Sequence, residues 1–475
     1  MALSNVDLDL LKTLYGRCDL FESLEPTDAR YQPVYQSGDR EDPVSRLKAH
    51  IDFSPVESLQ LFSGFRGSGK TTELFRLRAD LKQAGCAVIY ANALEYLNPA
   101  EPVEISDLLM VIAGAFSDRL KEDFDVDLLN ESFWRRITGY LQRTSLSVTE
   151  ATASVEADSP AKEVLGGLKT GLEVKLALKE ASSFRQRLRQ FLENRLTELK
   201  SEVNRSVEQG VKALRQKRGK DVPIVFIFDQ LEQLRGSASN EREVIYSVER
   251  TFASHLDKLR LPYVHAVYSV PPWLQFVLPG GVDIEVLPSF RIWQNNPDRT
   301  RDDDGWNQLR KLLFKRFGAE GFSRVFGASP GQESHPLADQ LIAASGGYFR
   351  DLLRIIRELL VRIRTQSQAM PATEELVKGA IQRVREQYSN LSEEDALWLE
   401  QVETTRACVP VRASAEEAAR LSRLLDLHLV FYFSNGEEWY DVHPLVRKDA
   451  AAIVSRLKKR ASAEPSEPSR RNPPK

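Results

Sequence analysis

The sequence predicts an α/β fold built on a central parallel sheet, followed by a helical unit and a small C-terminal domain. Two apolar runs without alternation, residues 224–228 and 264–268, are typical of strands buried on both faces, as parallel strands covered by helices are. A third run, residues 59–62, leads into a glycine-rich loop and then a helical pattern. The 475 residues suffice for two to four domains with their own cores.

Composition indicates an ordinary soluble protein, with 42% hydrophobic and 28% charged residues. The net charge of −3 gives no global attraction to nucleic acid or to an anionic membrane. Cys18, Cys86 and Cys408 are far apart and suggest neither a disulfide framework nor a metal site. No stretch approaches the roughly 20 apolar residues of a membrane span. We therefore expect a cytoplasmic protein without membrane contact.

The loop at residues 64–72 fits the phosphate-binding pattern G-x-x-x-x-G-K-[ST] at every fixed position. Glycines let the backbone turn its N–H groups toward phosphate oxygens, and the following helix directs its positive end to the same place. Lys70 is expected to reach the β- and γ-phosphates, and the Thr71 hydroxyl to ligate Mg²⁺. We assign nucleotide binding to Gly64, Gly67, Ser68, Gly69, Lys70, Thr71 and Thr72. The alternative, a glycine-rich turn that happens to precede a helix, is disfavoured because strand, loop and helix occur in register. The sequence predicts a nucleoside triphosphate site, with ATP and Mg²⁺ as ligands.

Residues 1–50 are expected to form an N-terminal helix and an adenine-flanking segment before the core at residues 51–300. Tyr31 and Tyr35 have two interpretations: they stack on the base of a nucleotide, or they pack within the protein, which is at least as common. The sequence leaves the two open.

A helical insertion is predicted at residues 118–220, with a Ser-, Thr-, Ala- and Gly-rich stretch at 145–170 that we expect to be mobile. It ends in one long helix over residues 184–217, whose apolar stripe faces a basic side. The basic side is interpreted first as a solvated face and second as a docking surface for nucleic acid or an acidic partner.

Three polar residues mark the ends of the predicted central strands. Asp229 closes the run 224–229 and is expected to hold Mg²⁺, because ligands of α/β sheets collect at the carboxyl ends of strands. Glu232 is the candidate general base, against the alternative of a helix N-terminal acid favoured by the helix dipole. Ser269, ending the run 264–269, is placed to sense the γ-phosphate. Residues 283–288 form the last predicted strand of the sheet.

The C-terminal part is predicted to be a helical lid, residues 301–390, and a winged-helix domain, residues 391–460. In the lid, a helix follows Gly346-Gly347 directly and carries Arg350 on its first turn, within reach of a cleft beside the core. Asn435-Gly436 between two β-rich runs is a strong hairpin signal, and a helix is expected at 414–427 before it. That helix lacks a basic excess, which favours a protein-contact role over DNA reading. The tail at 461–475 is expected to be disordered.

These residues together resemble the AAA+/STAND superclass of P-loop ATPases, especially bacterial members allied to origin-recognition-type ATPases. The resemblance covers roughly residues 20–450 and implies a P-loop NTPase core, a helical lid and a terminal winged helix. It implies that Arg350 touches the γ-phosphate as sensor 2, and that Asp229 and Glu232 form the D-x-x-[DE] acidic motif of STAND proteins. Gln230 departs from the glutamate of ring-forming members, which puts fast hydrolysis in doubt.

Two functions follow from the sequence. The first is an ATPase switch with slow hydrolysis, in which Mg-ATP sets the lid and winged-helix orientation and controls self-assembly or an effector protein. The resemblance implies a bacterial stress or phage-defence module as its setting. The second is a DNA-binding regulator whose winged helix and basic helix grip a duplex while ATP sets the affinity. The near-neutral charge balance favours the first.

Overall fold

The computed structural model describes residues 3–37, 41–126, 133–141, 171–237, 239–278, 282–367, 370–388, 390–407, 423–434 and 437–463.

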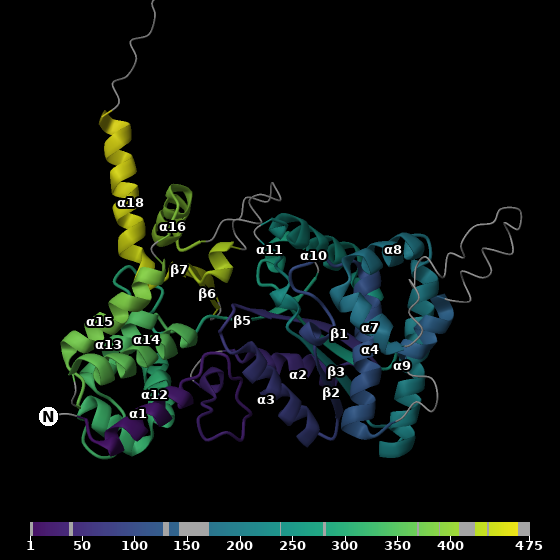
Figure 1. Ribbon diagram of the computed structural model, residues 1–475, viewed down its shortest axis with the longest axis horizontal. Coiled ribbons are helices and arrows are strands. Elements are labelled where there is room, and N and C mark those ends of the chain that lie inside the picture. Colours follow the sequence, from purple (N-terminus) through teal and green to yellow (C-terminus); the bar gives the residue numbers. More distant parts are fainter. Residues whose placement is uncertain are drawn as a thin grey trace, which may run out of the picture.

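A five-stranded sheet lies at the centre of the molecule (Figure 1). Its strands are all parallel and occur in the order β2-β3-β4-β1-β5. They are β1 (Ser58–Gly64), β2 (Ala87–Asn92), β3 (Ile224–Asp229), β4 (His265–Val270) and β5 (Ile284–Leu287). The predicted α/β fold with a central parallel sheet is confirmed.

Helices cover both faces of the sheet, as unbroken apolar strands require. One face carries α2 (Pro43–Phe53) and α3 (Lys70–Gln83). The other carries α4 (Ile105–Phe124), with α9 (Leu196–Arg218) packed beside it and α10 (Glu241–His255) in the same apolar core. Strand β3 shows the division, since Val225 and Ile227 lie in the core on the α3 side, whereas Phe226 and Phe228 lie in the core on the α4 side. All six residues of β3 are buried, so Asp229 ends the strand inside the protein.

The insertion differs from its prediction. The single helix predicted over 184–217 is wrong: α8 (Ser182–Leu192) and α9 are separate helices. Arg195 has non-helical backbone angles, φ −123° and ψ 20°, and its guanidinium donates to the Phe191 carbonyl at 2.9 Å, capping the end of α8. The break lets both helices pack against α4, which one straight helix cannot do. Helix α7 (Gly171–Glu180) precedes them, and the stretch 145–170 lies outside the described residues.

Several cations of the predicted basic face are turned inward. Arg189 donates to the buried carboxylate of Asp107, and Arg185 donates to the carbonyls of Leu178 and Lys179 at 2.9 Å. These side chains are therefore occupied in holding α7 and α8 to the core. These contacts argue against a docking role for Arg185 and Arg189. They also differ from the predicted solvated face, because both guanidinium groups are bonded to groups inside the protein.

The helical unit after the sheet stands beside it (Figure 1). It contains α12 (Asp303–Phe326), α13 (Pro336–Ser345), α14 (Phe349–Arg362) and α15 (Glu374–Arg385). Helix α1 (Asn5–Arg17) packs on α12 and α14, so the N-terminus belongs to this unit in space. Helix α12 bends at Gly318, whose φ is +69°.

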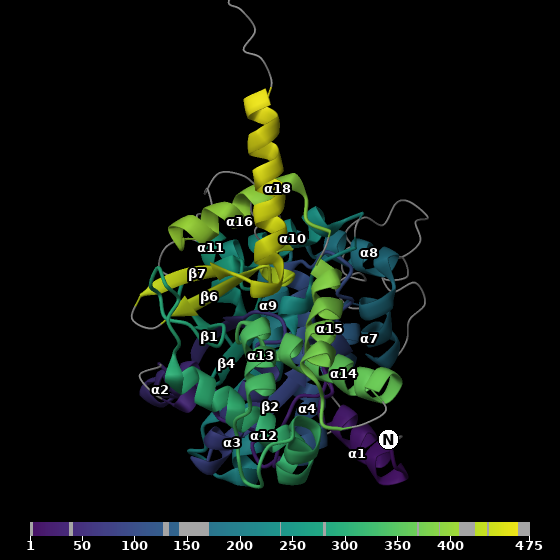
Figure 2. The ribbon, with the colours of Figure 1, turned by 90° about the vertical axis from the view of Figure 1, so that its left-hand side faces the viewer.

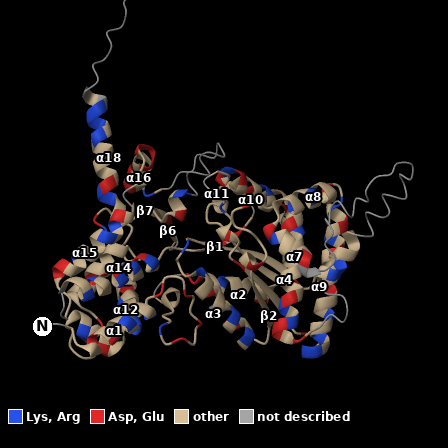
Figure 3. Ribbon diagram, in the orientation of Figure 1, with Lys and Arg blue, Asp and Glu red and all other residues tan. Residues whose placement is uncertain are grey.

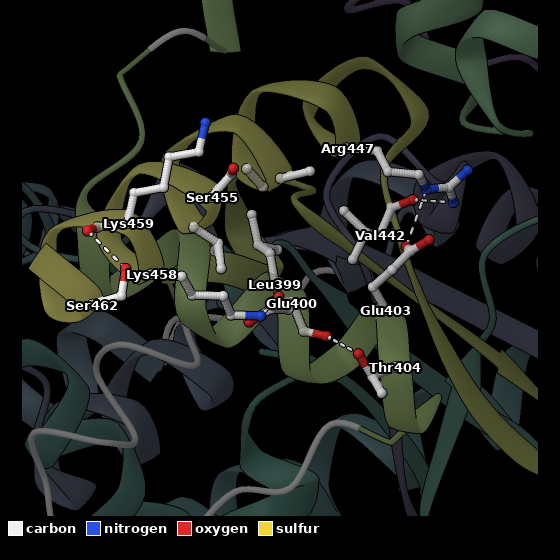
Figure 4. Close-up of a pocket in the computed structure, with 13 residues that line it drawn as sticks. Leu399, Glu400, Glu403, Thr404, Val442, Arg447, Ser455, Lys458, Lys459 and Ser462 are labelled. Carbon is white, nitrogen blue, oxygen red and sulfur yellow. Dashed lines mark hydrogen bonds and ion pairs between the residues drawn. The ribbon is translucent and has the colours of Figure 1, made fainter.

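The C-terminal elements are α16 (Glu393–Thr405), β6 (Val430–Ser434), β7 (Glu438–Val442) and α18 (Pro444–Ala463). Strands β6 and β7 pair antiparallel, as the hairpin prediction requires, although Asn435-Gly436 and most of 414–427 lie outside the described residues. Helices α16 and α18 pack together around a groove of about 550 Å³ (Figure 4). Figure 2 shows the far end of α18 projecting from the body.

The hairpin is tied to the sheet. The Ser289 N–H, just after β5, donates to the Tyr432 carbonyl of β6 at 2.8 Å. The C-terminal elements therefore reach the same end of the sheet as the loop after β1.

Candidate nucleotide site

The phosphate loop joins the end of β1 to the start of α3. Gly67 and Gly69 have φ of +79° and +96°, a backbone region that side chains with a Cβ rarely adopt. A Cβ on Gly67 would lie 2.7 Å from the Tyr348 hydroxyl and 2.8 Å from Arg350 Nε. The loop therefore needs glycine both for its shape and for the close approach of the lid.

Lys70 is buried at the start of α3 and faces back into the loop. Its Nζ donates to the carbonyls of Gly64 and Phe65 at 2.8 and 3.1 Å, and lies 3.3 Å from Glu232 Oε1. Ser68 closes the loop by donating its hydroxyl to the Phe65 carbonyl at 2.7 Å. A cation held on loop carbonyls beside a helix N-terminus is suited to a polyanionic ligand.

Asp229 and Thr71 meet where the strand ends. The Thr71 hydroxyl donates to Asp229 Oδ2 at 2.8 Å, and the Tyr90 hydroxyl donates to the same oxygen at 2.7 Å. Burial, and next the nearby charge of Glu232, raise the pKa of Asp229 above its ordinary value. A divalent cation would relieve this unfavourable buried charge. A hydroxyl and a carboxylate in contact are also the oxygen donors that Mg²⁺ prefers, so the residues fit the predicted metal.

Glu232 lies in a short turn, η3 (Leu231–Gln233), directly after β3. Gln230 takes a left-handed conformation, φ +71°, which turns the chain sharply and brings Glu232 toward the loop. Ser269 donates its hydroxyl to Glu232 Oε2 at 2.7 Å and accepts the Leu231 N–H at 3.2 Å. Ser269 thus orients Glu232, and Lys70, Glu232 and Ser269 form one continuous chain of polar contacts.

The first turn of α14 lies against the phosphate loop. The Tyr348 hydroxyl donates to the Arg66 carbonyl at 2.7 Å, and Arg350 Nε is buried with no hydrogen-bond partner among the described residues. Gly347 permits this contact, because a Cβ there would lie 1.9 Å from the Phe290 carbonyl oxygen. The structure brings Arg350 beside Gly67, where the sequence places a lid arginine.

The N-terminal segment touches the site from outside. Thr72 accepts the Leu24 N–H at 3.2 Å, so its hydroxyl fixes that segment. Tyr31 and Tyr35 are both buried; the Tyr35 hydroxyl donates to the carbonyls of Ser68 and Pro288 at 3.3 and 2.9 Å. The Tyr35 ring also packs edge-on against Phe290. These contacts fit the packing interpretation of the two tyrosines.

A C-terminal segment also reaches the loop. The His428 ring lies 4.1 Å from the Tyr348 ring, and Asp426 pairs with Arg235 at 3.5 Å. Burial raises the pKa of Asp426 to about 6, although Arg235, Lys70 and Arg66 oppose the rise. The segment before β6 therefore contributes a carboxylate to the cations around the phosphate loop.

Sequence reasoning did not identify Tyr90, Asp426 or His428 as part of this site. Tyr90 could have been identified from the sequence. A tyrosine hydroxyl in a buried strand next to the predicted Asp229 strand needs a hydrogen-bond partner. Asp426 and His428 could not have been identified, because their approach depends on how the C-terminal elements pack against the core.

Comparisons with known proteins add little to this geometry. No protein-family model matches the chain, and no curated protein matches it. Among solved structures, the ORC2 protein of Aeropyrum pernix in its ADPNP–ADP complexes is 12% identical, with a TM-score of 0.36 over 94% of this chain and 100% of that one. Cdc6p from Pyrobaculum aerophilum is 12% identical, with a TM-score of 0.35 over 94% and 98% of the two chains. A Walker-type ATPase of Pyrococcus abyssi is 13% identical, with a TM-score of 0.38 over 92% and 99%. Scores this low carry no argument, so the conclusions below rest on the site.

Within the described part of the chain, no helix is both long enough and apolar enough to cross a bilayer.

Proposed function

We propose that this chain is an ATP-binding, slowly hydrolysing molecular switch of the AAA+/STAND type. The observation that carries the proposal is the convergence of three elements on one loop: Lys70 and Thr71 from α3, Asp229 and Glu232 from β3 and its turn, and Arg350 from α14. Together these elements supply groups for the four tasks that phosphoryl transfer needs: phosphate binding, metal binding, water activation and charge neutralisation.

The roles follow from the contacts. The loop N–H groups and Lys70 bind the phosphates, while Thr71 and Asp229 would hold Mg²⁺, which neutralises charge on the β- and γ-phosphates. Glu232 is the candidate base, since its carboxylate is oriented by the Ser269 hydroxyl and can accept a proton from water. Gln230 points its backbone N–H at Asp229 Oδ1, 2.7 Å away, so it serves to shape the turn.

Slow turnover is expected because Lys70 and Glu232 are paired in this structure, 3.3 Å apart. The pair must separate before Lys70 contacts phosphate and Glu232 contacts water. The contact of α14 with the phosphate loop would link a bound nucleotide to the lid. It would also link the nucleotide to the C-terminal elements, which we propose form a winged helix. Movement of the lid and the C-terminal elements in response to ATP would then control the output. That output is self-association or binding of an effector protein in the cytoplasm.

The experiment is to measure ATP binding and turnover by the pure protein with Lys70→Ala and Glu232→Gln variants. Lys70→Ala should lose binding and turnover, whereas Glu232→Gln should bind ATP and turn over at least about a hundredfold more slowly. Lys311→Ala and Glu243→Gln change the same residue types at exposed positions and should match the wild type. Full turnover by Glu232→Gln would contradict its role, and full binding by Lys70→Ala would contradict the site.

The DNA-binding alternative gains no specific support from the described residues. Adding duplex DNA to the same assays at roughly 50 and 200 mM salt decides it, because phosphate-dominated binding falls steeply over that range.

A further inference from the structure

A groove of about 680 Å³ lies at the C-terminal end of α9, where this helix meets the loop before β4. Val211 of α9 and Tyr263 of that loop supply its apolar surface, and its cations are Lys212, Arg215 and Lys220. Figure 3 shows basic residues gathered at this end of α9. The groove is separate from the phosphate loop, because Tyr263 precedes the amino end of β4, whereas the phosphate loop follows the carboxyl end of β1, which runs parallel to β4.

Two other cations at this end of α9 are engaged with the last turn of α4. Lys217 pairs with Asp125 at 3.0 Å, and the Arg218 guanidinium lies over the Phe124 ring at 5.3 Å. These two side chains therefore hold α9 to α4 and do not belong to the groove.

The three cations of the groove are not neutralised. Lys212 and Lys220 are exposed, and neither has a carboxylate partner among the described residues. Arg215 is half-buried, and its Nε has no hydrogen-bond partner in the described part of the chain. Glu208 is the one acidic residue in the lining. The groove therefore has an excess of positive charge that the described residues do not balance.

Tyr263 is held at the groove in an unusual backbone conformation. Its φ is +61°, in the left-handed region that bulky residues rarely occupy, and its N–H donates to Glu57 Oε2 at 2.9 Å. The residue is nevertheless 45% exposed, and the Arg215 guanidinium lies over its ring at 5.8 Å. Residues kept in rare conformations often contact ligands, and an exposed aromatic ring beside free cations is suited to such a contact.

We propose that this groove binds an acidic segment of a partner protein, which places an apolar side chain against Tyr263 and carboxylates beside Lys212 and Lys220. Tyrosine and arginine often dominate the binding energy of protein interfaces, and the charges around them select partners of opposite sign. The proposal restricts the docking interpretation of the predicted basic face to the end of α9. It is independent of the proposed nucleotide chemistry.

Two features favour a protein segment over a strand of nucleic acid. Arg215 covers one face of the Tyr263 ring, on which a base would otherwise stack. Glu208 would face a strand that carries a phosphate at every nucleotide, whereas a peptide can place an uncharged residue there.

The test is fluorescence anisotropy of a labelled peptide, glutamate throughout except for one central phenylalanine, titrated with the full chain. Binding should weaken at least about tenfold in the Lys212→Glu, Lys220→Glu double variant, because like charges then face the peptide carboxylates. The Lys311→Glu, Lys448→Glu double variant makes the same charge change at exposed lysines of α12 and α18 and should leave the affinity unchanged.

Tyr263→Asn separates apolar anchoring from charge attraction. Asparagine tolerates the left-handed conformation, so this variant removes the ring without adding backbone strain. It should bind the phenylalanine peptide at least about fivefold more weakly than the wild type does. A peptide with serine in place of the phenylalanine should bind the wild type and Tyr263→Asn equally. Equal binding of the two peptides by the wild type would overturn the contact with Tyr263.

Cations in the last turn of a helix also stabilise its negative end, and that simpler role predicts that no peptide binds. Absence of binding, or binding that the Lys212→Glu, Lys220→Glu variant does not weaken, would therefore overturn the proposal. Tighter binding of a single-stranded oligonucleotide than of the peptide would overturn the protein partner. A Lys70→Ala chain should bind the peptide like the wild type, so failure of the nucleotide site is recognised separately.

Discussion

The Tyr90 hydroxyl supports the carboxylate that is proposed to hold the metal. It donates to Asp229 Oδ2 at 2.7 Å from the neighbouring strand, alongside Thr71. Residues that hydrogen-bond to a metal ligand orient it, and their loss typically weakens metal binding 10–100-fold.

We therefore expect Tyr90→Phe to raise the Mg²⁺ concentration needed for half-maximal turnover by about tenfold, with little effect on ATP binding without metal. A Mg²⁺ titration of ATP turnover measures this. Tyr246→Phe, which removes the hydroxyl of an exposed tyrosine on α10, is the control and should titrate like the wild type. An unchanged Mg²⁺ requirement in Tyr90→Phe would separate Tyr90 from the metal site.

Asp351 is a buried carboxylate one residue beyond Arg350, and it joins the lid to the C-terminal elements. It accepts from the Tyr388 hydroxyl at 2.6 Å and from Arg354 at 2.7 Å, and lies 3.1 Å from His443 Nε2. Burial alone would raise its pKa, but these three partners outweigh burial and lower the pKa of Asp351 to about 2. A carboxyl whose pKa is lower in the folded state stabilises the fold at pH values above its unfolded pKa.

This stabilisation, roughly 2 kcal/mol at neutral pH, should disappear as the pH falls from about 4 to about 2. Asp351→Asn should lower the free energy of unfolding by about 2–4 kcal/mol at pH 7, since it leaves buried partners without their anion. It should also flatten the loss of stability in that acid range. Asp339→Asn disrupts a partly exposed pair with Arg310 and should cost at most about 1 kcal/mol. Urea unfolding at several pH values measures both, and equal costs for the two variants would contradict the assignment.

At the scale of elements, the turn between α13 and α14 decides how the lid meets the core. Gly347 has φ +95°, and a Cβ added at this position would lie 1.9 Å from the Phe290 carbonyl oxygen. The turn can therefore pack against the segment after β5 only if this residue is glycine.

Gly347→Ala should destabilise the fold by more than Gly85→Ala, because Gly85 has a similar φ of +89° but open space around its missing Cβ. We expect about 1–2 kcal/mol for Gly85→Ala from backbone strain alone, and at least about 1 kcal/mol more for Gly347→Ala. Denaturant unfolding measures the difference. Similar losses for both variants would show that the lid does not depend on this close approach.

The elements also show what the sequence can and cannot predict. The buried strands and the phosphate loop were predictable because unbroken apolar runs and the glycine pattern are local properties. The break at Arg195 was not, because the apolar stripe keeps its helical spacing across the three-residue gap. The approach of Asp426 to Arg235 and of His428 to Tyr348 depends on packing between distant segments, which no local pattern encodes.

At the scale of the whole molecule, three regions meet at the phosphate loop: the sheet, the lid and the segment before the hairpin. Tyr348 connects the loop to the lid and to the segment before the hairpin, since its hydroxyl donates to the Arg66 carbonyl, its ring packs on His428, and it lies directly before α14. A ligand shifts such an arrangement only by binding one state better than another. Arg350, whose Nε has no hydrogen-bond partner among the described residues, is the group through which a γ-phosphate would favour one state.

The most direct test of the switch is hydrogen exchange of α14 and the β6–β7 hairpin, measured without nucleotide and with saturating Mg-ATP in the wild type and in Arg350→Ala. We predict that ATP changes exchange in both elements of the wild type, and that Arg350→Ala still binds ATP but shows no change there. Identical exchange with and without ATP in the wild type would contradict the switch.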